Sequence, residues 1–127
     1  MKITEDYVSF EVAKLLQKKG FDEPCRSYFI NNGAYIDSSY SIEELTDLNI
    51  GFWETLRPTH QMACAWLREV YKIFIEISVS IDLNRDYHYS YSILKEFEYI
   101  RKGYTDFDWG YKEAVEAALK YSLKNLI

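Results

Sequence analysis

Two histidines and two cysteines are the residues of this chain that best fit metal chemistry. His60 and Cys64 are four residues apart, so on a helix they would share one flank, and Cys25 with His88 would complete a set of two Cys and two His. That set can bind a tetrahedral structural zinc ion. Zinc modules ordinarily carry two closely spaced ligand pairs, and this chain has one. We therefore expect packed cysteines, surface histidines and no metal.

Catalytic chemistry has little support in the sequence. A nucleophilic thiol has to be exposed and activated, and Cys64 falls in the middle of a predicted helix. Twenty acidic residues always allow some carboxylate pair, so a pair alone carries no information, and the five glycines form no phosphate-binding loop. We expect a protein without cofactor that is not an enzyme, and an enzyme of unknown class is the last alternative.

The candidate binding residues lie where the central helix is predicted to begin. Arg57 and His60 flank its first residues, where free amide N–H groups and the helix dipole favour an anion. Phe52 and Trp53 lie in an aromatic loop just before them, and loops with large aromatic residues often carry function. The sequence thus predicts a binding site at Phe52, Trp53, Arg57 and His60. The competing interpretation is that Arg57 and His60 are ordinary surface residues beside a capped helix.

Length and composition narrow the class of protein. At 127 residues the chain is expected to form a single domain, 1–127, and its 48% apolar residues include no run of the roughly 18 that a membrane helix needs. A net charge of −5, spread along the chain, argues against general nucleic-acid binding. The first residues, MKITEDYVSF, lack the basic and apolar regions of a signal peptide, so we expect a cytoplasmic protein with reduced thiols.

Aromatic content is the unusual property of this chain. It reaches 17%, with twelve tyrosines. Tyr packs an apolar ring while its hydroxyl stays available to water or a partner. An excess of Tyr therefore fits either a small domain that is short of aliphatic core or a contact surface.

Periodicity and capping signals predict the elements that position these residues. Ser9 and Gly20 mark the two ends of a first helix, and an Asn-Gly turn predicts a hairpin over 25–36. Signals weaken over 37–57, apart from a short capped helix at 41–48. The remaining prediction is a helix from 58, strands over 73–82 and 87–94, an ambiguous segment 95–103, and a last helix capped by Asp108 with an apolar stripe of Tyr111, Val115, Ala118, Leu119, Ser122 and Leu126.

The stretch from 58 to 82 has the clearest pattern and is expected to organise the core. Its helix places Met62, Ala63, Trp66, Leu67 and Val70 on one face. Its strand alternates, with Ile73, Ile75, Ile77, Val79 and Ile81 on one side. Matching apolar rows predicts Val79 opposite Tyr91 and Ile77 opposite Ile93, across a loop of three or five residues.

These elements predict an α+β fold, with an antiparallel sheet of about four strands and about three helices packed mainly on one face. Some strand must then be an edge. Ala34 to Ile36 or Tyr87 to Leu94 could pair across a two-fold axis, so a homodimer is a further hypothesis.

Three stretches resemble a known group of proteins: VSFEVAKLLQKKGFDEPC, PTHQMACAWLREVYKIFIEI and YKEAVEAALKYSLKNLI. The chain is similar there to small proteins encoded by bacteriophages and prophages of gut Bacteroides-type bacteria. The resemblance implies a phage-associated protein made in the host cytoplasm, and it carries over no catalytic residues.

Three functions are therefore compared. We expect first an accessory protein that binds a host or phage macromolecule, with a protein as the partner. The alternative is a binder of a small, nucleotide-like molecule, which would use the helix start and stacking aromatic rings. An enzyme comes last.

Overall fold

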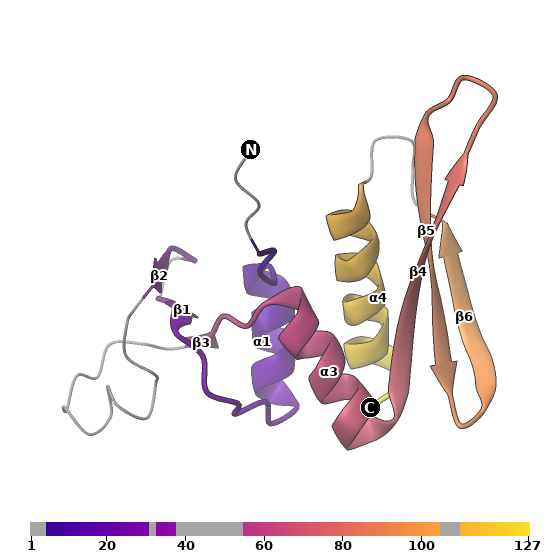
Figure 1. Ribbon diagram of the computed structural model, residues 1–127. Coiled ribbons are helices and arrows are strands. Elements are labelled where there is room, and N and C mark those ends of the chain that lie inside the picture. The colour runs from indigo at the N-terminus through magenta and orange to yellow at the C-terminus, as the bar shows by residue number, and fades with distance from the viewer. Residues whose placement is uncertain (1–4, 31–32, 38–54, 105–109) are drawn as a thin grey trace, which may run out of the picture. The chain divides into compact units, whose positions relative to one another are not determined.

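The computed structural model describes residues 5–30, 33–37, 55–104 and 110–127 (Figure 1). The chain forms two compact units, residues 1–62 and 63–127, and each is described by itself. The α+β class is confirmed. The described strands form two antiparallel sheets of three strands each, whereas the sequence predicted one sheet of about four.

The first unit combines one helix with a small sheet. Its elements are α1 (Phe10–Lys18), β1 (Ser27–Phe29), β2 (Tyr35–Asp37) and β3 (Thr55–Leu56). The strand order is β2-β1-β3, so β1 is central. The hairpin predicted over 25–36 is confirmed, with a shorter first strand and a second strand that lies one residue later, at 35–37. The two-residue strand β3 lies at the end of the weak region and had no signal in the sequence. The helix predicted over 41–48 lies outside the described residues.

Both ends of α1 are built as the sequence predicts. The side chain of Ser9 accepts a hydrogen bond from the amide of Val12 at 3.2 Å, which is an N-cap. At the other end Gly20 has a φ of +88°, and the amide of Phe21 donates to the carbonyl of Leu16 at 3.0 Å. Glycine adopts this left-handed conformation without strain, so the chain leaves the helix cleanly.

A helix leads directly into the long strand of the second unit, as predicted. The helix α3 (His60–Tyr71) crosses the boundary between the units and is followed by β4 (Ile73–Ile81). Lys72 makes the junction with a φ of +57°, and its amide still donates to the carbonyl of Arg68 at 3.2 Å. On α3 the structure buries Ala63, Trp66 and Leu67, but Val70 is exposed, contrary to the predicted stripe.

The sheet of the second unit has one face covered by a helix (Figure 1). Strands β4, β5 (Tyr87–Lys95) and β6 (Glu98–Tyr104) follow in the order of the chain, and α4 (Tyr111–Asn125) packs on them. The ring of Tyr89 meets that of Tyr111 edge to face at 6.0 Å, and Lys95 Nζ donates to the carbonyl of Leu126 at 2.8 Å. Since β5 is the central strand, the predicted edge pairing by Tyr87 to Leu94 is wrong.

The predicted β4–β5 register is wrong by two residues. Val79 lies opposite Tyr89 and Ile77 opposite Tyr91, across a turn of five residues, 82–86. The shift by two keeps every side chain on its predicted face, because the side-chain period of a strand is two. The faces and the odd loop length were therefore predictable. The pairing partners were not, because Tyr and Ile in one row can exchange places without changing the pattern.

The apolar row of β4 is buried at one end only. Ile73 is fully buried, whereas Val79 is 57% and Ile81 63% exposed. Figure 1 shows the reason: the β4–β5 hairpin extends beyond the first turn of α4. The expectation that this whole row forms core is therefore wrong for its second half.

The core under α4 contains a close contact between an aromatic ring and a glycine. Tyr91 on β5 is buried and lies opposite Gly103 on β6, where a Cβ atom would overlap the tyrosine ring.

On α4 the predicted residues Val115, Ala118, Leu119 and Ser122 are buried, and so are Ala114 and Leu123. Tyr111 is exposed instead, and the predicted cap Asp108 lies outside the described residues. The carboxylate of Glu113 accepts from the amide of Gly110 at 3.0 Å at this helix start.

Candidate functional site

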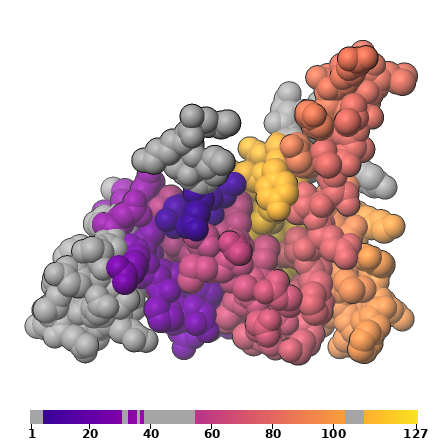
Figure 2. Space-filling view, viewed as in Figure 1, coloured from indigo at the N-terminus to yellow at the C-terminus, as the bar shows by residue number. Residues whose placement is uncertain are grey.

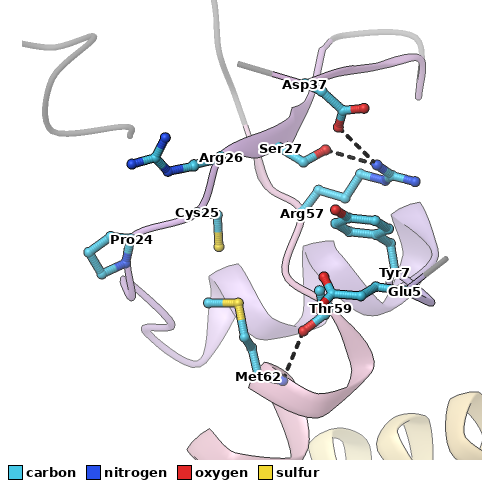
Figure 3. A pocket seen from close by; sticks show the side chains of 10 residues that line it. All are labelled: Glu5, Tyr7, Pro24, Cys25, Arg26, Ser27, Asp37, Arg57, Thr59 and Met62. Carbon is cyan, nitrogen blue, oxygen red and sulfur yellow. Dashed lines mark hydrogen bonds and ion pairs between the residues drawn. The ribbon is translucent and has the colours of Figure 1, made fainter. Parts of the chain in front are cut away.

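Arg57 lies in the centre of a dense cluster in the first unit. Its guanidinium carbon is 4.0 Å from the ring centre of Tyr7 and 3.6 Å from that of Tyr35. One guanidinium nitrogen donates to Ser27 Oγ at 2.8 Å and also pairs with Asp37 Oδ1 at 3.4 Å (Figure 3). The guanidinium is thus stacked between two aromatic rings and hydrogen-bonded in its plane, a combination that only an arginine can make.

Short segments from several parts of the unit position this cluster. Arg57 follows β3, and its amide donates to the carbonyl of Ser27 at 3.0 Å, which extends the pairing with β1. Tyr7 is held by an antiparallel bridge to Thr59, beside a 3.1 Å hydrogen bond from the amide of Val8 to the carbonyl of Pro58. Arg57 therefore connects the N-terminal segment, through Tyr7, to strands β1 and β2. This is a structural role.

A pocket of about 560 Å³ opens beside Arg57. The size is that of a small-molecule site. Its charged residues do not form one anion site, because Arg26 points away from Arg57 and two carboxylates share the lining (Figure 3). The lining residues are Glu5, Tyr7, Pro24, Cys25, Arg26, Ser27, Asp37, Arg57, Thr59 and Met62.

The predicted anion site at the start of α3 has few free amide N–H groups left to bind an anion. Thr59 Oγ1 accepts from the amide of Met62 at 3.1 Å, and the amide of His60 donates to the carbonyl of Asp6 at 2.9 Å. Two of the amides that an anion would need are therefore engaged within the protein. His60 is only 7% exposed, so the interpretation of it as a surface residue is wrong, and its binding role stays a prediction. Phe52 and Trp53 lie outside the described residues, and their role stays a prediction.

Both thiols have raised pKa values. Burial raises the pKa of Cys25 to about 11, and nearby Glu23 raises it further, so the thiol is protonated at neutral pH. Burial also raises the pKa of Cys64 to about 11, against an opposing effect of Arg68. Across the described ranges, no three His, Cys, Asp or Glu side chains gather where a metal ion could bind. His88 Nε2 instead lies 2.7 Å from Asp82 Oδ2.

A second candidate site lies on the sheet face opposite α4. Phe74, Leu94 and Tyr99 are direct neighbours across β4, β5 and β6. Phe74 is 39% and Tyr99 57% exposed, and Phe97 in the adjoining turn is fully exposed. Phe74, Phe97 and Tyr99 are called the aromatic patch below. The turn forms the lower right corner of the space-filling view (Figure 2).

The aromatic patch has polar and charged neighbours. The hydroxyl of Tyr99 donates to Glu76 Oε2 at 3.2 Å, and this negative charge raises the pKa of Tyr99. The ammonium of Lys102 lies 5.7 Å from the ring centre of Tyr99. An exposed aromatic centre with a charged rim is the usual composition of a protein-binding surface.

The sequence did not identify this patch because the turn that forms it has no turn signal. Glu96 and Phe97 connect β5 to β6 as a two-residue loop, and both have positive φ, +54° and +70°. Such a loop is ordinarily Asn-Gly or Gly-Gly. With Glu-Phe at these positions, residues 95–103 could not be assigned to a strand pair.

Comparisons with protein-family models, curated protein sequences and solved structures give no match. No helix in the described part of the chain has the length and apolarity needed to cross a membrane.

Proposed function

We propose that this protein is a non-catalytic accessory protein that binds another protein through the aromatic patch. The observation that carries the proposal is the exposure of Phe74 and Tyr99 on a sheet face that α4 leaves uncovered, beside the fully exposed Phe97 in the adjoining turn. Clustered exposed aromatic side chains on a small protein ordinarily mark a contact site. Aromatic residues are also the side chains that contribute most at the centre of protein interfaces.

The charges around the patch favour a protein as the partner. Glu76 accepts a hydrogen bond from Tyr99, Glu96 lies in the adjoining turn, and the ammonium of Lys102 lies 5.7 Å from the ring of Tyr99. A phosphate backbone or an anionic membrane would be repelled by these carboxylates and by the net charge of −5. A protein surface of mixed charge fits this rim.

The conformation of the turn supports the same proposal. A bulky residue at positive φ is strained, and Phe97 combines a φ of +70° with full exposure. Phe97 therefore carries backbone strain, and its exposed side chain contributes nothing to the hydrophobic core that would offset this strain. Strained residues of this kind cluster at functional sites, and a contact with a partner would account for this one.

The sequence resemblance supports a place of action and a source for the partner. Similarity to small bacteriophage and prophage proteins of Bacteroides-type bacteria suggests a partner from host or phage, met in the host cytoplasm. The high thiol pKa values of Cys25 and Cys64 support a role without nucleophilic catalysis.

The test compares three forms of the protein as bait in lysates of phage-infected host cells. The forms are the wild type, the double variant Phe97→Ser with Tyr99→Ser, and the control Leu83→Ser. Leu83 is equally exposed and apolar but lies in the β4–β5 turn, at the opposite end of β4 from Phe74. We expect the same partner with wild type and control, and at least a tenfold loss with the double variant. Binding of the purified partner then confirms a direct contact.

A partner retained equally by the double variant would contradict the assignment of this surface. Recovery of no partner above background by the wild type would count against protein binding as a whole. The melting temperatures of all three forms are compared first, so that loss of folding is not read as loss of contact.

Small-molecule binding in the pocket beside Arg57 is the second candidate. Its volume of about 560 Å³ favours this candidate, since ligand pockets occupy roughly 300–1,000 Å³. A nucleotide-like ligand would raise the melting temperature of the wild type, because it binds only the folded state. A screen without any rise would remove this candidate.

A further inference from the structure

The two edges of the sheet in the second unit differ in how well they are protected from pairing. Strand β6 carries Glu98, Arg101 and Lys102, and its register with β5 shifts at an irregularity near Ile93 and Leu94. Charges and bulges of this kind block the addition of another strand. Strand β4 has the sequence IFIEISVSI, with Glu76 as its single charge, and its nine residues pair with β5 without interruption. The edge of β4 therefore lacks these protections.

The second half of β4 is open on both faces. Ser78 and Ser80 are exposed on one face, and Val79 and Ile81 are 57% and 63% exposed on the other. A strand of alternating apolar and small polar residues with exposed main-chain groups is a template for a further strand.

We propose that β4 of a second copy of this chain pairs antiparallel with β4 across a two-fold axis, which joins two three-stranded sheets into one of six strands. This pairing is independent of the aromatic patch, which lies toward the other end of the strand. It also differs from an edge contact by β5, which the strand order excludes.

Charge and side-chain type favour one register. A two-fold axis at Glu76 would place this carboxylate opposite its own copy, and an axis at Val79 would place Glu76 opposite Asp82. Like charges that lie directly opposite destabilise a strand pair. An axis at Ser78 avoids both conflicts and pairs Ile77 with Val79 and Ile75 with Ile81, so that apolar residues cover each other.

The interface is large enough for a specific dimer. Pairing over residues 75–81 would form about six to eight main-chain hydrogen bonds. Ser78, Val79, Ser80, Ile81 and the neighbouring main chain would bury on the order of 500 Å² per copy, close to the lower limit of about 1,000 Å² in total for specific interfaces. We therefore expect a reversible dimer.

The first test is the molar mass in solution, measured by light scattering over a concentration series. The wild type is expected to approach twice the 15.1 kDa of one chain as concentration rises. Val79→Lys should raise the dissociation constant at least tenfold, because it places a charge in the apolar row. The matched control is Ile100→Lys on β6, another partly exposed apolar residue, which should leave the dissociation constant unchanged. A monomer mass at every concentration would overturn the proposal, and so would a dimer that Ile100→Lys weakens and Val79→Lys does not.

The second test needs no destabilising substitution. In the proposed register Ser78→Cys lies opposite its own copy and should form an intermolecular disulfide under mild oxidation. Ser90→Cys is the control, since Ser90 lies next to Ser78 on the same face but on the central strand, too far from its own copy. The high thiol pKa values of Cys25 and Cys64 keep the background reaction slow. Equal cross-linking of the two variants would contradict the pairing.

Discussion

Arg57, one of the residues that the sequence identified as candidates for binding, serves mainly to hold the first unit together. Its guanidinium carbon lies 4.0 Å and 3.6 Å from the ring centres of Tyr7 and Tyr35, and one of its nitrogens contacts Ser27 and Asp37. His60 is buried. A cation beside aromatic residues is equally compatible in sequence with a ligand site and with an internal clamp. Only the spatial arrangement of Tyr7 and Tyr35, from separate segments, distinguishes the two.

A structural role for Arg57 makes a prediction about stability. Arg57→Ala should lower the free energy of unfolding by about 2 kcal/mol, because a largely buried cation–π sandwich and a hydrogen bond are lost. Arg57→Lys should recover little of this, since an ammonium group cannot stack between two rings. The control is Arg26→Ala, at an exposed residue of the same pocket, with a change within about 0.5 kcal/mol. Urea unfolding measures all three, and equal losses at both arginines would refute the role.

The sequence predicted elements well where local chemistry determines them and less well where pairing does. Ser9 and Gly20 delimit α1 through their own hydrogen bonds and φ, so its ends were predictable. The two-residue strand β3 exists only because β1 lies beside it, so no local pattern could indicate it. The aromatic patch depends on the Glu96–Phe97 turn, which contradicts ordinary turn preferences, and was therefore missed.

The turn between β4 and β5 gives a prediction on pH dependence. Asp82 accepts hydrogen bonds from His88 and from the amides of Asn84 and Asp86, and these lower its pKa, with His88 the largest cause. A depressed folded-state pKa stabilises the protein above the unfolded value of about 3.9, and this contribution is lost as pH falls through the folded value. The melting temperature of the wild type should therefore exceed that of Asp82→Asn above about pH 5, and the difference should shrink below about pH 4. A difference that grows on acidification would contradict this role.

At the scale of the molecule, the sheet of the second unit accounts for both proposals. One face is covered by α4, and the other carries the aromatic patch. One edge is protected by charges, and the other is bare. The composition showed that the chain is rich in aromatic residues, but it could not show where on the folded protein these residues are exposed. The described strands form two sheets of three rather than one of about four. Most of their pairs are consecutive hairpins, and only the pairing of β1 with β3 joins segments far apart in the chain, which periodicity cannot reveal.

The most direct test of the aromatic patch uses a variant that should be folded better than the wild type. Replacing Glu96 and Phe97 by Asn and Gly provides the residues that positive φ favours at both positions, so the free energy of unfolding should rise by about 1 kcal/mol. The same variant removes the most exposed ring of the patch. Its melting temperature and its recovery of the partner from infected cells are measured together. We predict a higher melting temperature with at least a tenfold loss of the partner, whereas recovery at the wild-type level would contradict the proposed binding surface.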